Sequence, residues 1–118
     1  MQYLLLIYGS ESGQNTMNPA ELGAMYKEYE KFTGEIIASG NYQGGHELHS
    51  TEKATTVRVR DGKPVVTDGP FAETKEQLGG YYLIDAKDLD EATAIAARIP
   101  SAKFGSIEVR PIVVREGM

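Results

Sequence analysis

The chain contains 118 residues, of which 41% are hydrophobic and 25% charged, and its formal net charge at pH 7 is −5. This size and composition are those of one soluble domain with a single hydrophobic core, so residues 1–118 are assigned to one domain. The negative charge opposes binding to nucleic acids, and no cluster of lysine and arginine offsets it. The absence of cysteine excludes disulfides, thiolate catalysis and cysteine-based metal sites.

The apolar run Tyr3–Tyr8 opens the chain and predicts a strand with both faces covered. It is far too short to cross a bilayer, and it lacks the basic leader of a signal peptide. The absence of cysteine is consistent with a reducing compartment. We therefore expect a cytoplasmic protein with no membrane partner. Residues 9–16 are polar and predict a loop.

A long helix follows this loop. Asn18 is a suitable cap, Pro19 occupies the first turn, and Glu21 stands three residues after the cap. Apolar residues then recur at spacings of three and four, which predicts a helix over residues 19–39. Gly40 is expected to end it in a left-handed conformation.

The middle of the chain predicts two strands and a hairpin. Residues 41–48 form a weak strand, because two adjacent glycines interrupt it. Ala54–Arg60 alternates between two kinds of side chain, as a strand does. Asp61 and Gly62 favour a tight turn that leads into a strand over Lys63–Thr67.

The second half begins with the signature segment, residues 67–80, which combines a tight turn, a run of charges and a double glycine. It is longer than a hairpin needs, and such loops often carry binding and catalytic groups. Tyr81–Ile84 is the next apolar strand. Asp88 caps a predicted second helix over Leu89–Ile99, and Ile107–Val114 forms the last strand.

This order of elements resembles the β-α-β-β-α-β plan of a ferredoxin-like α+β fold with an elaborated middle. In that plan two helices cover one face of the sheet and leave the other face bare. Tyr3–Tyr8 and Tyr81–Ile84 are apolar on both faces, so the bare face needs a cover. We expect a homodimer that packs sheet against sheet. The alternative is a half-buried face whose tyrosine hydroxyls meet solvent.

Four segments are similar to the DGPF subgroup of the YCII-related proteins: residues 3–9, residues 54–62, the signature segment with its Asp-Gly-Pro-Phe run, and residues 105–111. The resemblance covers nearly the whole chain. It implies a dimeric α+β barrel like that of muconolactone isomerase, with a pocket between sheet and helices. Some related YCII proteins are thought to use a His–Asp pair with the histidine on the first helix. This chain has no histidine before residue 46, so that pair is not transferred.

Asp68 is the best remaining candidate for a general acid or base. Gly69 and Pro70 hold the backbone in a turn that would fix the direction of its carboxylate. The alternative is a structural role, in which the carboxylate accepts N–H bonds within the turn. Gly79 and Gly80 permit a bulge or a close backbone approach at a ligand or at the dimer seam. We therefore predict a pocket beside the signature segment with Asp68 as its central polar group.

Arg58, Arg110 and His46 are the candidate binding partners of Asp68. The two arginines could clamp a carboxylate or phosphate if their strands were neighbours. The alternative is that they form exposed ion pairs, with Glu108 as one acceptor. His46 follows two glycines and is a histidine that could titrate near neutral pH.

Neither a cofactor nor a metal is expected. His46 and His49 are three residues apart, so in a strand they point to opposite faces, and no cysteine completes a site. The sequence also lacks a dinucleotide-binding or phosphate-loop motif.

Two functions remain open. The first is a cofactor-free enzyme of proton transfer or elimination that binds an unidentified small molecule, as the resemblance to muconolactone isomerase implies. The second is a noncatalytic regulatory or interaction module, because DGPF proteins are often encoded beside extracytoplasmic-function sigma factors. An enzyme needs acid–base groups that converge on an enclosed volume, whereas a regulator can have a filled interior.

Overall fold

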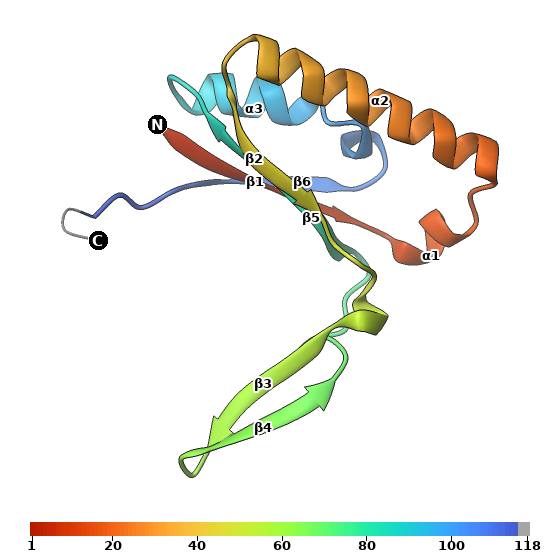
Figure 1. Cartoon of the computed structure of the whole chain (residues 1–118), viewed down its shortest axis with the longest axis vertical. Helices are drawn as coiled ribbons and strands as arrows, with labels where there is room; N and C mark the ends of the chain where they lie inside the picture. Colours follow the sequence, from red (N-terminus) through yellow and green to blue (C-terminus); the bar gives the residue numbers. More distant parts are fainter. Residues whose placement is uncertain (116–118) are drawn as a thin grey trace.

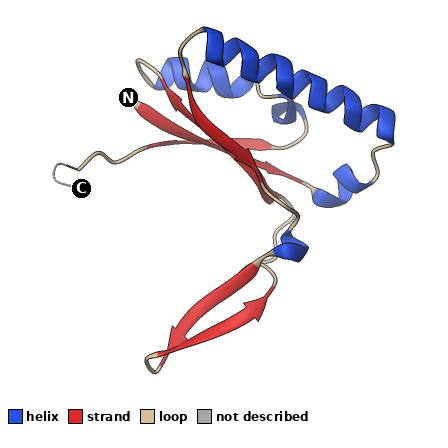
Figure 2. Cartoon of the chain, in the orientation of Figure 1, coloured by secondary structure: helices blue, strands red, loops and turns tan. Residues whose placement is uncertain are grey.

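The computed structural model describes residues 1–115, which form a mixed α+β fold with antiparallel sheets (Figure 1). The main sheet has four strands in the order β2-β5-β1-β6, and every neighbouring pair is antiparallel. These strands are β1 (Gln2–Gly9), β2 (Tyr42–Glu47), β5 (Gln77–Asp85) and β6 (Ser106–Pro111). Figure 2 shows the two long helices on one side of this sheet, as the expected plan requires.

The two long helices begin and end where the sequence indicates. In α2 (Pro19–Ala38) the Asn18 side chain accepts a hydrogen bond from the Glu21 N–H at 2.8 Å, and the Glu21 carboxylate accepts one from the Asn18 N–H at 3.1 Å. Gly40 follows with a φ of +82°, the left-handed region that favours glycine. In α3 (Leu89–Ala97) the Asp88 carboxylate caps the first turn.

The predicted loop over residues 9–16 is wrong in part, because it contains a short helix, α1 (Glu11–Asn15). Ser10 caps it by accepting a hydrogen bond from the Gly13 N–H at 3.3 Å. A short helix made of polar residues shows no apolar periodicity, so periodicity does not predict it. The capping serine is the local signal that indicates it.

The hydrophobic core fills the space between the sheet and the helices. Leu5 from β1, Ile36 from α2 and Ile84 from β5 are completely buried there. Tyr82 extends the core with an edge-to-face contact to Phe32, at 5.3 Å between ring centroids. Side chains of the described residues thus pack between sheet and helices, and the pocket that the resemblance implies there stays a prediction.

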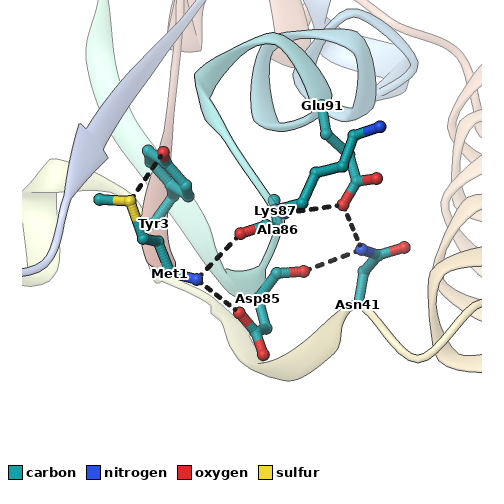
Figure 3. A network of polar contacts seen from close by, with 7 residues as sticks. All are labelled: Met1, Tyr3, Asn41, Asp85, Ala86, Lys87 and Glu91. Carbon is teal, nitrogen blue, oxygen red and sulfur yellow. Dashed lines mark hydrogen bonds and ion pairs between the residues drawn. The ribbon is translucent and has the colours of Figure 1, made fainter.

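A polar network joins the ends of several elements at one edge of the core (Figure 3). The Asn41 side-chain amide donates to the Asp85 backbone oxygen at 2.8 Å and to the Glu91 carboxylate at 3.3 Å. The same carboxylate accepts from the Lys87 N–H at 3.1 Å. The Met1 amino group contacts the Asp85 carboxylate at 3.1 Å. These bonds fix the start of β2 against the end of β5 and the start of α3.

The remaining strands, β3 (Thr55–Arg60) and β4 (Lys63–Asp68), form a separate two-stranded hairpin, here named the arm. Its turn contains Asp61 at φ 50° and Gly62 at φ 74°, as the Asp-Gly pair predicts. The arm projects from the end of the main sheet, on the side away from the helices (Figure 1). The radius of gyration is consequently 16.5 Å, against about 13.5 Å for a compact chain of this length.

None of the helices described within residues 1–115 has both the length and the apolar character needed to cross a membrane.

Candidate functional site

The open face is the surface of the main sheet that points away from α2 and α3. Tyr3 and Leu5 point into the core, so the alternation of β1 places Leu4, Leu6 and Tyr8 on the open face. These three side chains are half-buried. The strand registers add their neighbours on the same face. Together the open face comprises Leu4, Leu6, Tyr8, Gly44, His46, Tyr81, Leu83, Glu108 and Arg110.

One side of the open face carries a histidine–tyrosine pair. His46 on β2 lies directly opposite Tyr81 on β5, and its Nδ1 is 2.7 Å from the Tyr81 hydroxyl. Either atom is the donor, depending on the tautomer of the imidazole. Imidazole can take and release a proton near neutral pH, and a phenol in contact with it can relay a proton or hold a substrate oxygen.

A cationic group lies on the other side. Arg110 on β6 donates a hydrogen bond to Glu108 at 2.7 Å, and both side chains stand on the open face. The hydrogen bond and the charge of Glu108 raise the pKa of Arg110 above its ordinary value, so the guanidinium is charged at every working pH. One guanidinium has five donors, so most remain for a ligand after this pairing.

An apolar floor separates the two polar sides. Leu4 lies between Leu83 and Arg110 in the register, and Leu6 lies between Tyr81 and Glu108. The strands that carry His46 and Arg110 are three strand spacings apart, or roughly 14 Å. This surface can hold a flat, partly apolar molecule with oxygen atoms at both ends.

The other two predicted site residues lie on the arm. Asp68 pairs with Thr55 and Arg58 pairs with Val65, so their side chains point to opposite faces of the hairpin. Within one chain the four predicted residues therefore fall into two groups, His46 with Arg110 and Asp68 with Arg58. The strands of Arg58 and Arg110 are not neighbours, so the condition for a shared clamp is not met within one chain.

The structural alternative for Asp68 gains no support. Among residues 1–115, no backbone or side-chain group donates a hydrogen bond to its carboxylate. Gly69 follows at a φ of +96°, and its N–H donates to the Ala54 oxygen at 2.7 Å. The turn is thus held by backbone bonds, and the exposed Asp68 carboxylate is left for other contacts.

The signature segment borders an open hollow of about 370 Å³. Near this hollow, the Glu11 carboxylate accepts hydrogen bonds from the Thr51 hydroxyl at 2.6 Å and from the Thr51 N–H at 2.8 Å, which link α1 to the segment before the arm. Gln77 accepts from the Glu11 N–H at 3.0 Å. The hollow is lined by Thr51, Glu52, Gly69, Pro70, Ala72, Glu73, Thr74 and Gln77. None of the four predicted site residues is among these lining residues.

The double glycine forms the bulge and the close approach that the sequence predicts. Ile7 pairs with Gly80 and Tyr8 pairs with Leu78, so Gly79 is the extra residue of a β-bulge. A side-chain carbon on Gly80 would lie 2.9 Å from the His46 backbone oxygen. The glycine therefore brings β2, and with it His46, close to β5.

Tyr81 is the site residue that sequence reasoning missed. The sequence pattern predicts it only as part of an apolar strand, although its alternation with the core residue Tyr82 places it on the open face. Its pairing with His46 could not be foreseen, because it depends on the register between β2 and β5.

A model of the YCII-related domain matches residues 1–115. The chain belongs to the YCII-related family. It is 37% identical over 116 residues to the uncharacterized protein R00369 of Rhizobium meliloti (strain 1021), across 97% of this chain and 94% of that protein. Its placement in the DGPF subgroup remains a prediction.

A solved structure shares the fold of this YCII-related chain. It is 5-chloro-2-hydroxyhydroquinone dehydrochlorinase (TftG) from Burkholderia phenoliruptrix AC1100, in complex with 2,5-dihydroxybenzoquinone. The TM-score is 0.56 at 14% sequence identity, with 96% of this chain and 94% of that chain covered. At this identity the similarity shows the fold alone.

Proposed function

We propose that this YCII-related protein is a cofactor-free enzyme that transfers a proton, in an isomerisation or an elimination, on a small molecule bound at the open face. The observation that carries the proposal is the 2.7 Å contact between His46 Nδ1 and the Tyr81 hydroxyl beside an apolar floor. An acid–base group next to a surface that excludes water from one side of a ligand is the minimum that such chemistry requires.

In an elimination of this kind, the base removes a proton next to the carbon that bears the leaving group. The released electron pair forms a double bond, and the leaving group departs with its own bonding pair. His46 is suited to receive the proton, directly or through Tyr81. Arg110 is suited to hold an anionic oxygen of the substrate at the opposite side of the face.

The fold neighbour supports this reaction class. TftG is a dehydrochlorinase, which is an elimination enzyme, and its structure holds a flat, oxygen-bearing ring compound. A ligand of that shape suits an apolar floor with polar groups on two sides. The proposal for this chain nevertheless depends on its own side chains, because the first helix of this chain carries no histidine.

We also propose that two copies form a homodimer with their open faces toward one another, as in a dimeric α+β barrel. The support is the row of half-buried leucines, Leu4, Leu6 and Leu83, on a face that no helix within residues 1–115 covers. Pairing the faces would enclose the substrate and lower the local dielectric, which strengthens electrostatic contacts to a reacting group. No observation on the described residues favours the regulatory module over the enzyme.

Hydrogen–deuterium exchange tests the proposed chemistry without knowledge of the natural substrate. In D₂O, proton NMR would follow the ring protons of 2,5-dihydroxybenzoquinone and of related hydroxylated and chlorinated rings. We expect wild-type protein to accelerate exchange, and His46→Gln and Tyr81→Phe each to reduce the acceleration by about 100-fold or more.

His49→Gln is the matched control, since His49 lies just beyond β2 and outside the open face. An acceleration that persists in both His46→Gln and Tyr81→Phe would contradict the assignment of the pair. A wild-type protein without effect on any of these rings would contradict the proposed reaction class.

A further inference from the structure

We propose that the arm of one copy packs its apolar face against the open face of a second copy and thereby delivers Asp68 to the partner's site. The docking is inferred from the arm itself, and only the role given to Asp68 rests on the proposed function.

The two faces of the arm differ in chemistry. The register pairs Val57 with Val66 and Val59 with Pro64 on one face, and the three valines are 60–65% exposed. Asp68 and Thr55 lie at the base of this same face. The opposite face is basic and polar. It carries Thr56, Arg58, Arg60, Lys63, Val65 and Thr67.

The apolar face of the arm is left exposed by residues 1–115 of its own chain. A two-stranded hairpin is at best marginally stable alone in water. Hydrogen bonds hold the base of the arm, where Thr56 donates to the Gly69 oxygen at 2.8 Å and Gly69 donates to Ala54. Beyond that base it extends away from the domain, and the chain measures 49 × 48 × 18 Å (Figure 1).

A second copy is the occupant that the shape of the molecule favours. The arm projects on the side of the sheet opposite to the helices, so the arm and the open face form the two sides of one angle in the molecule (Figure 1). Because the molecule is only 18 Å thick, both lie within one thin layer. One body seated in this angle would cover the arm's valines and the leucines of the open face together. In a two-fold dimer each copy provides both surfaces reciprocally.

The basic residues of the arm lie away from the proposed contact. The chain has a net charge of −5, so two copies repel one another at long range. The arm carries three basic residues, Arg58, Arg60 and Lys63, against the acidic residues Asp61 and Asp68. These basic residues lie on the face opposite to the valines, so in this docking they stay in solvent and the contact itself is mainly apolar.

Docking of the arm would give Asp68 a role at the site that it does not have within one chain. Its carboxylate shares the face of Val57 and Val66, so packing of that face would turn Asp68 toward the partner. There it would join His46, Tyr81 and Arg110 on the partner's open face. Arg58 lies on the other face of the arm and would stay in solvent.

The first test compares two neighbouring valines of β4. Val66→Asp places a charge on the apolar face, whereas Val65→Asp places the same charge on the opposite face. By sedimentation velocity, we expect Val66→Asp to weaken the dimer by about 100-fold or more, because a buried unpaired charge is costly. Val65→Asp should leave the dimer essentially intact. A wild-type dimer that neither variant weakens would overturn the docking of the arm while leaving the paired sheets possible.

The second test does not depend on how well a charged variant folds. The chain has no cysteine, so single substitutions give clean crosslinking sites. Copies with Val66→Cys are mixed with tagged copies carrying Leu6→Cys and treated with a short bis-maleimide. We expect a crosslinked heterodimer from this mixture and little from the control mixture of Val65→Cys with Leu6→Cys.

Crosslinks that form only between two copies of Val66→Cys would show that the arms pair with each other and would overturn the proposal. A wild-type protein that is monomeric at 100 micromolar, a concentration far above that of typical specific dimers (Kd on the order of 1 µM), would also overturn it. The exchange assay with His46→Gln would still report separately on the proposed chemistry, because that variant does not alter the arm.

Discussion

His46 Nδ1 and the Tyr81 hydroxyl lie 2.7 Å apart on neighbouring strands of the open face. This contact depends on Gly80, whose lack of a side chain allows the His46 backbone to approach β5. Gly80 of the signature segment therefore helps to position the proposed acid–base pair, although a glycine has no side chain that could take part in chemistry.

Alanine substitutions at Gly79 and Gly80 should distinguish the β-bulge from the close approach of β2 to β5. A side-chain carbon at Gly80 would lie 2.9 Å from the His46 oxygen, whereas one at Gly79 would meet only the Ile7 oxygen, at 3.9 Å. We expect Gly80→Ala to lower the free energy of unfolding by about 1–3 kcal/mol, and Gly79→Ala to cost much less. Urea unfolding measures both values, and equal losses would contradict the close approach.

Truncation of neighbouring leucines in β1 should distinguish the core from the open face. Leu5 is completely buried between sheet and helices, while Leu6 is half-buried on the open face. Leu5→Ala should lower the free energy of unfolding by about 2–5 kcal/mol. Leu6→Ala should cost less at concentrations where the protein is monomeric and should weaken the dimer. If Leu6→Ala left the dimer affinity unchanged in sedimentation experiments, the open face would not be the interface.

The buried tyrosines predict how stability depends on alkaline pH. Burial raises the pKa of Tyr82 above the ordinary value of 10.0, and a hydrogen bond with Thr33 only partly opposes this effect. The unfolded chain therefore loses this proton first, so the stability is fully present below pH 10 and falls as pH rises through the pKa of the folded state.

Tyr82→Phe should make this alkaline loss of stability shallower than in wild type. Tyr29→Phe should act in the same direction, because burial also raises the pKa of Tyr29. Urea unfolding at several values between pH 9 and pH 11.5 provides the comparison, a window of roughly one pH unit on each side of the ordinary value. A variant that loses stability as steeply as wild type would show that the tyrosine ionises equally in both states.

Asp68→Asn tests the proposed contribution of the arm to the site. The carboxylate is exposed and accepts no hydrogen bond among residues 1–115, so the variant should unfold at the same urea concentration as wild type. The acceleration of hydrogen–deuterium exchange on the ring compounds should nevertheless be lost in the dimer. Loss of folding would instead identify Asp68 as a structural residue of the turn, and the site assignment would then be abandoned. Asp61→Asn, in the turn of the arm, is the matched control.

Much of the fold follows from local signals in the sequence. The cap formed by Asn18 and Glu21, the left-handed Gly40 and the turn at Asp61 and Gly62 each specify a backbone conformation without help from distant residues. Strong apolar periodicity placed both long helices within two residues of their observed ends.

The features that the sequence did not reveal depend on pairing between distant strands. Ala54–Arg60 was correctly expected to be a strand, but nothing local indicates that it leaves the main sheet and forms an arm. The pairing of His46 with Tyr81 similarly requires the register of β2 on β5. The constrained turn at Asp68 and the alternating arginines predict that Arg58 approaches Asp68, yet alternation along the hairpin places the two side chains on opposite faces.

The most direct test of the proposed site is the response of the two histidines to a ligand. Side-chain nitrogen–proton NMR spectra of uniformly labelled protein resolve His46 and His49, and His49→Gln assigns the remaining signal. On titration with 2,5-dihydroxybenzoquinone, we expect the His46 signal to shift with saturation and the His49 signal to remain in place. Tyr81→Phe should weaken this binding. A His46 signal that does not move while the quinone binds elsewhere would contradict the assignment of the open face as the functional site.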